Sequence, residues 1–249
     1  MPPKAAGEDR QRMDRPPNEH MRNHMQQTAA SGDMPPGAEF VLRTTLTSPY
    51  GRKVRMAADI LGLMERIAVV PADTLDETDT LRQQNPLGKM PCLLLPDGSA
   101  IYDSPIIVEL LQELAGKDRL MPWYGEERFL RLTEARLADG ITDAALLMVY
   151  ERRFRAEPQV SERWLAHQRG KIERGLSVFE KTPPQGTTVI ALGLACALGY
   201  LDWRKPYDWR SHFPGLVRWL DAFAEAEPAF RRSGPPSAHA SEVSHAATS

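Results

Sequence analysis

The sequence predicts a small α/β domain followed by an all-helical domain. In the first half of the chain, short β-branched or apolar runs alternate with helical patterns. A strand, a helix and a second strand in succession imply parallel pairing through a right-handed crossover. After residue 125 the strand signals stop and long helical patterns follow one another. We therefore expect a βαβαββα unit over residues 39–119 and an all-helical domain over residues 125–232.

The elements of the first domain follow from short local patterns. Residues 40–46 form a β-branched run that predicts a strand. Ser48-Pro49 then predicts a helix start, with the hydroxyl at the N-cap and the proline at the first helical position. Gly62 predicts the end of that helix. Residues 66–70 predict the second strand.

A hairpin and a second capped helix complete the first domain. The polar stretch 73–84 leads to two apolar runs, 92–95 and 100–102, with an Asp-Gly pair between them. Such a pair between apolar runs predicts a hairpin. Ser104-Pro105 repeats the pattern of hydroxyl and proline, which predicts a helix with Ser104 as its N-cap.

The second domain is expected to be a bundle of helices. Their patterns cover residues 126–155, 161–181, 189–204 and 214–226. The third pattern is apolar on all sides and is expected at the centre of the domain. Its uncharged run, 189–201, is shorter than the ~20 residues that a membrane span needs, so no membrane partner is expected.

The flanking segments, 1–38 and 233–249, are expected to be disordered. Residues 1–39 contain no Val, Ile, Leu or aromatic residue, so they cannot bury enough apolar surface to offset the entropy of ordering. They also lack the apolar core of a signal peptide. The tail after Arg232 is low in complexity and rich in Ser, Pro and Ala.

Composition excludes several classes of partner. The chain has 249 residues, a formal net charge of -2 and a hydrophobic fraction of 42%. This balance does not favour a nucleic acid or a membrane surface. Cys92 and Cys196 lie far apart and belong to no metal-binding pattern. No metal and no disulfide framework are therefore expected, and a cytoplasmic location fits.

Three short motifs indicate a binding site in the first domain. They are Thr47–Arg55 (TSPYGRKVR), Gly88–Leu93 (GKMPCL) and the Asp103-Ser104 pair. In this order and spacing they resemble the cytosolic glutathione transferase superfamily, and the likeness covers residues 40–232. The central apolar helix resembles that of a bacterial subset with a serine in the first loop. The resemblance implies a thioredoxin-like first domain that binds glutathione.

Ser48 is the candidate catalytic residue. The resemblance implies that it contacts the sulfur of glutathione. An ordinary thiol has a pKa of about 8.5, so it is mostly protonated at neutral pH. A hydroxyl donor and a helix N-terminus both favour the thiolate. Neither a cysteine nor a tyrosine occupies this position, which argues against thiol–disulfide chemistry. The alternative is that Ser48 serves only as a helix cap.

Lys89, Met90 and Pro91 are candidate glutathione-binding residues. The resemblance implies a cis bond before Pro91, which leaves the backbone N–H and C=O of Met90 facing outward like a strand edge. The cysteinyl backbone of glutathione can pair there, and Lys89 is a candidate for its glycyl carboxylate. The alternatives are a trans proline at an edge strand and a solvated lysine.

Asp103 and Ser104 complete the candidate glutathione site. The Ser104 hydroxyl and the backbone N–H groups of a helix start can bind the γ-glutamyl carboxylate, and Asp103 can take up the α-ammonium group. The alternative is an ordinary pair of capping residues.

Met148 and Tyr150 are candidate walls of a second pocket, with helix core as the alternative. Tyr50 is expected to be a packing or rim residue.

The sequence thus predicts a homodimeric glutathione transferase. It would use glutathione as co-substrate, without a bound cofactor, and conjugate it to a small hydrophobic electrophile. Two alternatives remain open. One is a related binding or regulatory protein without turnover, and the other is a glutathione-dependent isomerase, dehalogenase or disulfide reductase on the same fold. Cys92 and Cys196 are expected to be buried structural residues.

Overall fold

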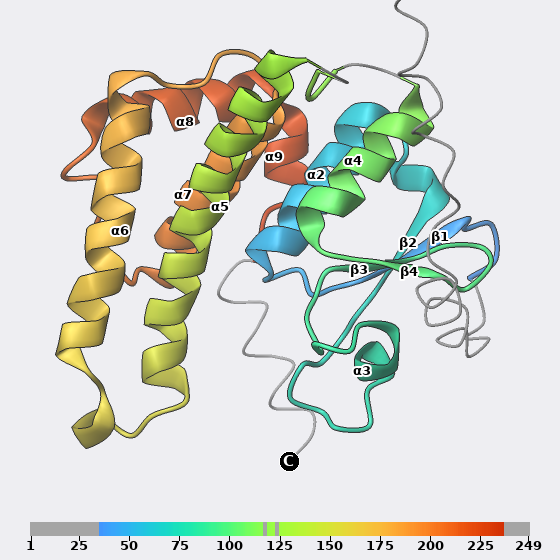
Figure 1. The fold of residues 1–249 in the computed structure, drawn as a ribbon, viewed down its shortest axis with the longest axis horizontal. Helices are drawn as coiled ribbons and strands as arrows, with labels where there is room; N and C mark the ends of the chain where they lie inside the picture. The colour runs from blue at the N-terminus through green and yellow to red at the C-terminus, as the bar shows by residue number, and fades with distance from the viewer. Residues whose placement is uncertain (1–34, 117–118, 123–124, 237–249) are drawn as a thin grey trace, which may run out of the picture.

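The first domain is built on a four-stranded sheet with strand order β2-β1-β3-β4 (Figure 1). The structure, a computed structural model, describes residues 35–116, 119–122 and 125–236. Its strands are β1 (Phe40–Arg43), β2 (Ile67–Val70), β3 (Cys92–Leu94) and β4 (Ala100–Ile101). β1 pairs in parallel with β2 and antiparallel with β3, and β3 forms a hairpin with β4. The predicted crossover and hairpin are confirmed.

Helices cover the sheet of the first domain (Figure 1). They are α2 (Pro49–Leu61), α3 (Leu81–Gln84) and α4 (Ser104–Ala115), with a 3-10 turn η1 (Met64–Arg66) before β2. α2 and α4 pack against each other, and short α3 lies across the sheet from them. α2 begins with Ser48 as its N-cap and ends at Gly62, as predicted. The φ of Gly62 is 74°, in the left-handed region that glycine adopts without strain.

The second domain is a helical bundle with α7 at its centre. Its helices are α5 (Glu126–Arg153), α6 (Glu162–Lys181), α7 (Val189–Arg204), α8 (Pro214–Ala226) and α9 (Pro228–Arg232), and a 3-10 turn η2 (Glu157–Gln159) joins the first two. α5 packs against both α6 and α7. Residues 189–198 of α7 are all buried, in agreement with the predicted central helix. Thr188 caps α7 by accepting the N–H of Ala191 at 3.2 Å.

α2 also joins the two domains. It packs against α7 and α9. The Lys53 Nζ atom lies 2.6 Å from Oδ1 of Asp139 on α5, and both side chains are buried. Nη2 of Arg52 donates to the Phe230 carbonyl on α9 at 2.8 Å. The basic residues of α2 therefore face the second domain instead of solvent.

Some boundaries differ from the sequence predictions. β1 ends at Arg43, so residues 44–47 form a loop and do not extend the strand. The N-cap of α4 is Asp103, so the prediction of Ser104 as N-cap was wrong by one residue. α9 was not predicted, because its 5 residues are too few to show a helical period.

The predicted segments 1–38 and 233–249 lie mostly outside the described residues. Ser233, the first residue of that tail, is only 5% exposed. Its carbonyl accepts a hydrogen bond from Nη2 of Arg55 at 2.8 Å. Among the helices that the structure describes, none has the length and apolar character to span a bilayer.

Candidate functional site

The three sequence motifs meet at one edge of the sheet. β1 and β4 both pair antiparallel with β3, so they run in the same direction and end at the same edge. Ser48 follows β1 at this edge, and residues 103–104 follow β4. β3 begins here, because Cys92 pairs with Arg43, the last residue of β1, and Pro91 directly precedes it. The topology thus gathers the candidate residues in one place.

The Ser48 hydroxyl accepts one hydrogen bond through its oxygen and keeps its proton free to donate another. Its Oγ atom accepts the backbone N–H of Gly51 at 3.1 Å, the capping bond predicted from the sequence. Within residues 35–116, 119–122 and 125–236, no acceptor takes the Ser48 proton in a hydrogen bond. The side chain is 9% exposed and borders a pocket. It can therefore donate to an anion placed in that pocket.

Close packing fixes the start of α2. Gly51 lies in the first turn, against the side chain of Thr44 in the loop after β1. A Cβ atom on Gly51 would lie 2.0 Å from Thr44 Oγ1, closer than any real contact. The absence of a side chain at Gly51 therefore allows the helix N-terminus to sit against the loop that carries Ser48.

The loop before Pro91 is held by Asn85. The Met90–Pro91 peptide bond is cis, as the resemblance implied. Asn85 is 2% exposed, and its Nδ2 atom donates to the Lys89 carbonyl at 2.8 Å. The Thr45 hydroxyl, in the loop after β1, donates to Met90 Sδ at 3.5 Å. This contact joins the loop before the first motif to the second motif, while the Lys89 side chain stays exposed to solvent.

Arg43 ties the segment around α3 to the sheet, a role that the sequence analysis missed. Its guanidinium donates to Asp79 Oδ1 at 2.7 Å and to Thr80 Oγ1 and Gln84 Oε1 at 2.8 Å each. Burial acts to raise the pKa of Asp79. The backbone N–H groups of residues 73 and 81 and the Arg43 charge outweigh this and hold that pKa below its usual value. The segment leading to the cis-proline loop is therefore anchored.

Asp103 and Ser104 occupy the start of α4. Asp103 is exposed and makes no capping hydrogen bond with its side chain. Ser104 is 1% exposed and is the first residue of α4, and Pro105 follows it in the first turn. This arrangement offers hydrogen-bond donors for an anion beside an exposed carboxylate.

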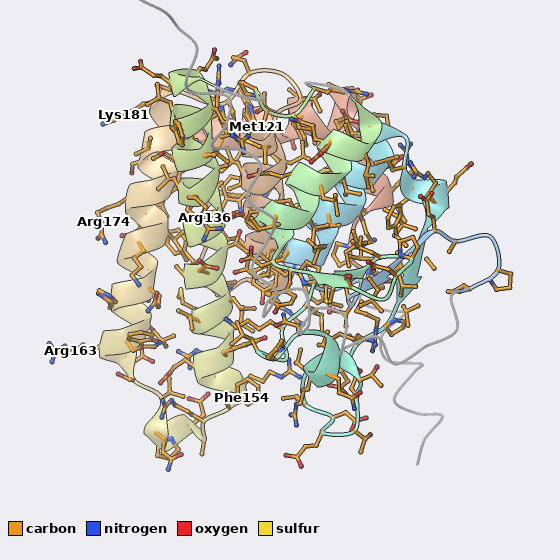
Figure 2. The ribbon with its side chains drawn as sticks, turned by 45° about the vertical axis from the view of Figure 1, so that its right-hand side comes forward. Met121, Arg136, Phe154, Arg163, Arg174 and Lys181 are labelled. Atoms are coloured by element: carbon orange, nitrogen blue, oxygen red, sulfur yellow. The ribbon has the colours of Figure 1, made fainter. Side chains whose placement is uncertain are left out.

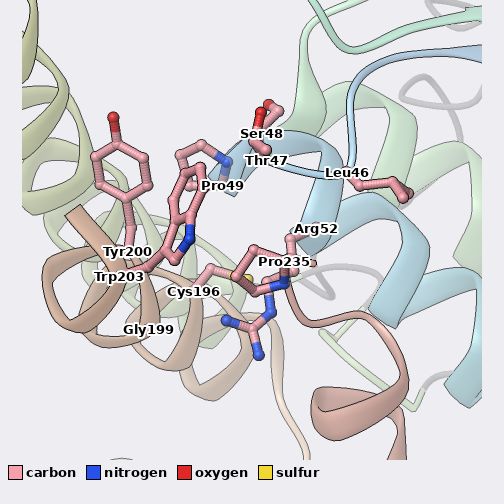
Figure 3. Close-up of a pocket in the computed structure, with 10 residues that line it drawn as sticks. All are labelled: Leu46, Thr47, Ser48, Pro49, Arg52, Cys196, Gly199, Tyr200, Trp203 and Pro235. Atoms are coloured by element: carbon pink, nitrogen blue, oxygen red, sulfur yellow. The ribbon is translucent and has the colours of Figure 1, made fainter. Parts of the chain in front are cut away.

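A pocket adjoins Ser48 between the two domains (Figure 3). One side is formed by residues 46–49, with Arg52 below them. The other side comes from the last turns of α7, together with Pro235. The α7 residues are Cys196, Gly199, Tyr200 and Trp203. They follow the spacing i, i+3, i+4 and i+7 of one helical face, a signal present in the sequence but not used in its analysis.

The thiols and two tyrosines around the candidate site are held in their neutral forms. Burial raises the pKa of the Cys196 thiol to about 11 and that of the Cys92 thiol to about 12. Burial likewise raises the pKa of Tyr200 to about 12. Tyr50 donates to Asp143 on α5, and burial and this carboxylate both raise its pKa. Neither thiol is therefore poised to act as a nucleophile.

The candidate walls on α5 do not line this pocket. Met148 is 4% exposed and belongs to the apolar core. Tyr150 packs edge-on against Phe154, with ring centroids 5.2 Å apart. Phe154 lies at the end of α5 (Figure 2). Met148 therefore has the role that was the alternative for it, a residue of the helix core. No group of three or more His, Cys, Asp or Glu side chains suited to a metal ion occurs among the described residues.

Comparison with known proteins agrees with this geometry. Residues 47–114 match the family model of the glutathione S-transferase N-terminal domain. The uncharacterised GST-like protein YibF of Escherichia coli K12 is 35% identical over 77% of this chain and 96% of its own length. A glutathione transferase family member from Pseudomonas fluorescens Pf-5, solved with bound glutathione, is 37% identical and superposes with a TM-score of 0.75. The match covers 80% of this chain and 100% of that one. The same protein has been solved with S-(propanoic acid)-glutathione, with a TM-score of 0.71 to this chain. The chain therefore belongs to the glutathione transferase family.

Proposed function

We propose that this chain is a serine-type glutathione transferase that ionises glutathione with Ser48 and conjugates it to a small electrophile. The observation that carries the proposal is the Ser48 hydroxyl. It stands at the N-terminus of α2, its oxygen already accepts the Gly51 N–H, and its proton is available at the edge of the pocket. The Pseudomonas relative holds glutathione, which supports the same ligand here.

Ionising the thiol requires a modest free energy. Lowering its pKa by two units from about 8.5 takes about 2.7 kcal/mol. A hydrogen bond to the anion contributes about 1.5–3 kcal/mol, and a helix N-terminus adds up to about 1 kcal/mol at an exposed site. Ser48 and α2 together therefore suffice. The relative's S-(propanoic acid) conjugate is an S-alkylated glutathione, which supports S-alkylation as the reaction class.

The rest of glutathione would extend along the edge of the sheet. Its cysteinyl backbone would pair with the Met90 backbone before Pro91. Its γ-glutamyl carboxylate would meet Ser104 and the N–H groups of α4, with its ammonium group near Asp103. Lys89, exposed on the same loop, would meet the glycyl carboxylate.

The proposal includes a homodimer formed through α4 and the start of α5. These helices are joined by the Arg128–Glu109 ion pair at 2.6 Å. Next to it, Ile106 is 50% exposed and Phe129 is 70% exposed. A second copy that covers these side chains would bury them. We expect sedimentation to give a dimer and Phe129→Glu to shift it towards monomer. A monomeric wild type would refute this part.

A cytoplasmic location also belongs to the proposal, because both cysteines are free thiols.

The test is the pH dependence of conjugation to a neutral aromatic electrophile. In Ser48→Ala the rate near pH 6.5 should fall about tenfold or more, because the bound thiol would lose a donor that favours its anion. Part of the loss should return as the pH rises. Affinity for glutathione at low pH should barely change, because the hydroxyl does little for the neutral thiol.

Thr47→Ala is the matched control, since Thr47 lines the same pocket but its hydroxyl is bonded to Thr45 at 3.0 Å. Its pH profile should resemble that of the wild type. A wild-type profile for Ser48→Ala would reduce Ser48 to a helix cap. If bound glutathione shows no thiolate absorbance near neutral pH, the chain is a binding protein.

A further inference from the structure

The segment that follows α9 ends at the pocket beside Ser48. We call this segment, residues 233–236, the C-terminal strap. Its Pro235 lines the pocket together with Ser48 and Trp203 (Figure 3). The space left between the lining side chains has room for about one water molecule. An electrophile therefore cannot occupy this pocket while Pro235 stands where the structure places it.

One face of α2 holds the start of the strap. Asp59, Arg55 and Arg52 follow one another at intervals of four and three residues, so they share a face of the helix. Arg232, directly before the strap, forms an ion pair with Asp59 at 2.8 Å. The Ser233 carbonyl accepts Nη2 of Arg55 at 2.8 Å. The chain therefore passes along α2 from its last turn towards its N-terminus.

The Arg52 guanidinium points away from Ser48 and holds the end of α9 (Figure 3). It stacks on the Phe230 ring, 3.9 Å from the ring centroid, and its Nη2 atom donates to the Phe230 carbonyl at 2.8 Å. Its Nε atom donates to Ser233 Oγ at 3.5 Å. Gly199 makes room for this position, since a Cβ atom there would lie 2.3 Å from Nη1 of Arg52. Arg52 is therefore part of the anchor of the strap.

Arg55 joins the strap to the loop that carries Ser48. Its side chain is buried, and its Nη2 atom donates both to the Ser233 carbonyl at 2.8 Å and to the Leu46 carbonyl at 3.3 Å. Leu46 lines the same pocket, two residues before Ser48. One side chain thus holds the start of the strap and the Ser48 loop at a fixed separation.

The anchoring contacts stop before Pro235. The N–H of Gly234 donates to the Arg231 carbonyl at 3.2 Å. Pro235 and Pro236 have no N–H group, and neither makes a hydrogen bond with the residues that the structure describes. Packing alone therefore keeps Pro235 in the pocket, and it can move out without breaking the anchor on α2.

We propose, on the basis of the function proposed above, that the C-terminal strap is autoinhibitory: Pro235 closes the pocket beside Ser48, and an electrophile reaches the sulfur from this side after Pro235 has moved out. The proline favours the closed state, because its fixed φ leaves less conformational freedom to lose on closure. Since the extent of opening sets the room for the electrophile, Pro235 is also a specificity-determining residue.

The test measures how accessible Cys196 is, because this thiol lines the pocket and is 2% exposed. N-ethylmaleimide is added to the full chain at a mildly alkaline pH without glutathione, and mass spectrometry follows the alkylation of each cysteine separately. In Pro235→Gly, Cys196 should react at least about tenfold faster than in the wild type, because the packed ring and the rigidity of proline are both lost. Cys92, which is 0% exposed in the first domain, should keep its rate and so reports on general unfolding.

Pro236→Gly is the matched control. Pro236 is the next residue of the strap and does not line the pocket. This variant loses the same rigidity, yet its Cys196 should react within about threefold of the wild-type rate. The proposal is wrong if Pro235→Gly leaves Cys196 at the wild-type rate, if both variants accelerate it equally, or if Cys92 is accelerated as much. If Pro235→Gly fails to fold, Pro235→Ala takes its place, with the same order of rates expected.

A second measurement connects closure with conjugation. The kcat/KM values for iodomethane and for the bulkier 4-nitrobenzyl chloride are each divided by the rate of the uncatalysed reaction with glutathione. Pro235→Gly should raise this enhancement for the bulkier electrophile at least about threefold more than for iodomethane. Equal changes would refute the role of Pro235 in specificity. No turnover of either electrophile, together with faster alkylation of Cys196, would instead refute the function proposed above and support closure by Pro235.

Discussion

Removing either partner of the Lys53–Asp139 ion pair should destabilise the protein by unequal amounts. The two side chains are 4% and 6% exposed, and their charged atoms lie 2.6 Å apart. Asp139 has a second partner, since its Oδ2 atom lies 2.9 Å from Nη1 of Arg136, whose side chain is 55% exposed. Lys53 has one carboxylate partner within the described residues, which is Asp139.

The magnitudes follow from what each substitution leaves behind. Asp139→Asn leaves Lys53 buried without a counter-charge, a situation that costs about 3–5 kcal/mol. Lys53→Met removes the cation and fills its space with an apolar chain, while Asp139 keeps Arg136. We expect that variant to lose only about 1–2 kcal/mol. The double variant should lose less than the sum of the two, by at least about 1 kcal/mol.

The assay is urea unfolding at pH 7, followed by tryptophan fluorescence. Arg66→Met serves as control, because its ion pair with Glu39 joins side chains that are 38% and 45% exposed and should contribute little to stability. Additive losses would refute the reasoning, and so would a loss for Lys53→Met that equals or exceeds the loss for Asp139→Asn.

Two further outcomes are expected from the first domain. Ser104→Ala should weaken glutathione binding by about 1–3 kcal/mol in calorimetry, the scale of a hydrogen bond to a charged group, and unchanged affinity would leave Ser104 with a structural role only. Because the folded protein holds the pKa of Asp79 below its usual value, the associated stability is present near neutral pH and is lost as the pH falls below about 4. Asp79→Asn should therefore unfold with a weaker dependence on pH in that acidic range than the wild type, and parallel curves would contradict this.

Local sequence patterns predicted the edge of the sheet where the candidate site lies. A crossover and a hairpin fix the directions of β1, β3 and β4 relative to one another, so the motifs at their ends had to meet. Ser48 was recognisable because a hydroxyl followed by proline starts a helix. The binding and catalytic roles of the residues from Ser48 to Ser104 remain predictions, although these residues lie together.

The missed features depend on contacts between distant parts of the chain. Arg52 and Lys53 look like solvated charges in the sequence, and their burial depends on Phe230 and Asp139, far along the chain. Arg43 likewise gains its role only when the segment around α3 folds back onto β1. No periodicity marks such partners, because the pairing is set by the packing of one element on another.

On the proposed function, the position of α2 would bring glutathione and a second substrate together. Its N-terminus presents Ser48, its next turn presents Arg52, and its body packs against α7, which supplies Tyr200 and Trp203. The aromatic wall belongs to the other domain, which α2 also contacts through Lys53 to Asp139 on α5 and through Arg52 to the Phe230 carbonyl on α9. Substitutions in the domain interface should therefore alter the fit of the electrophile more than the ionisation of glutathione.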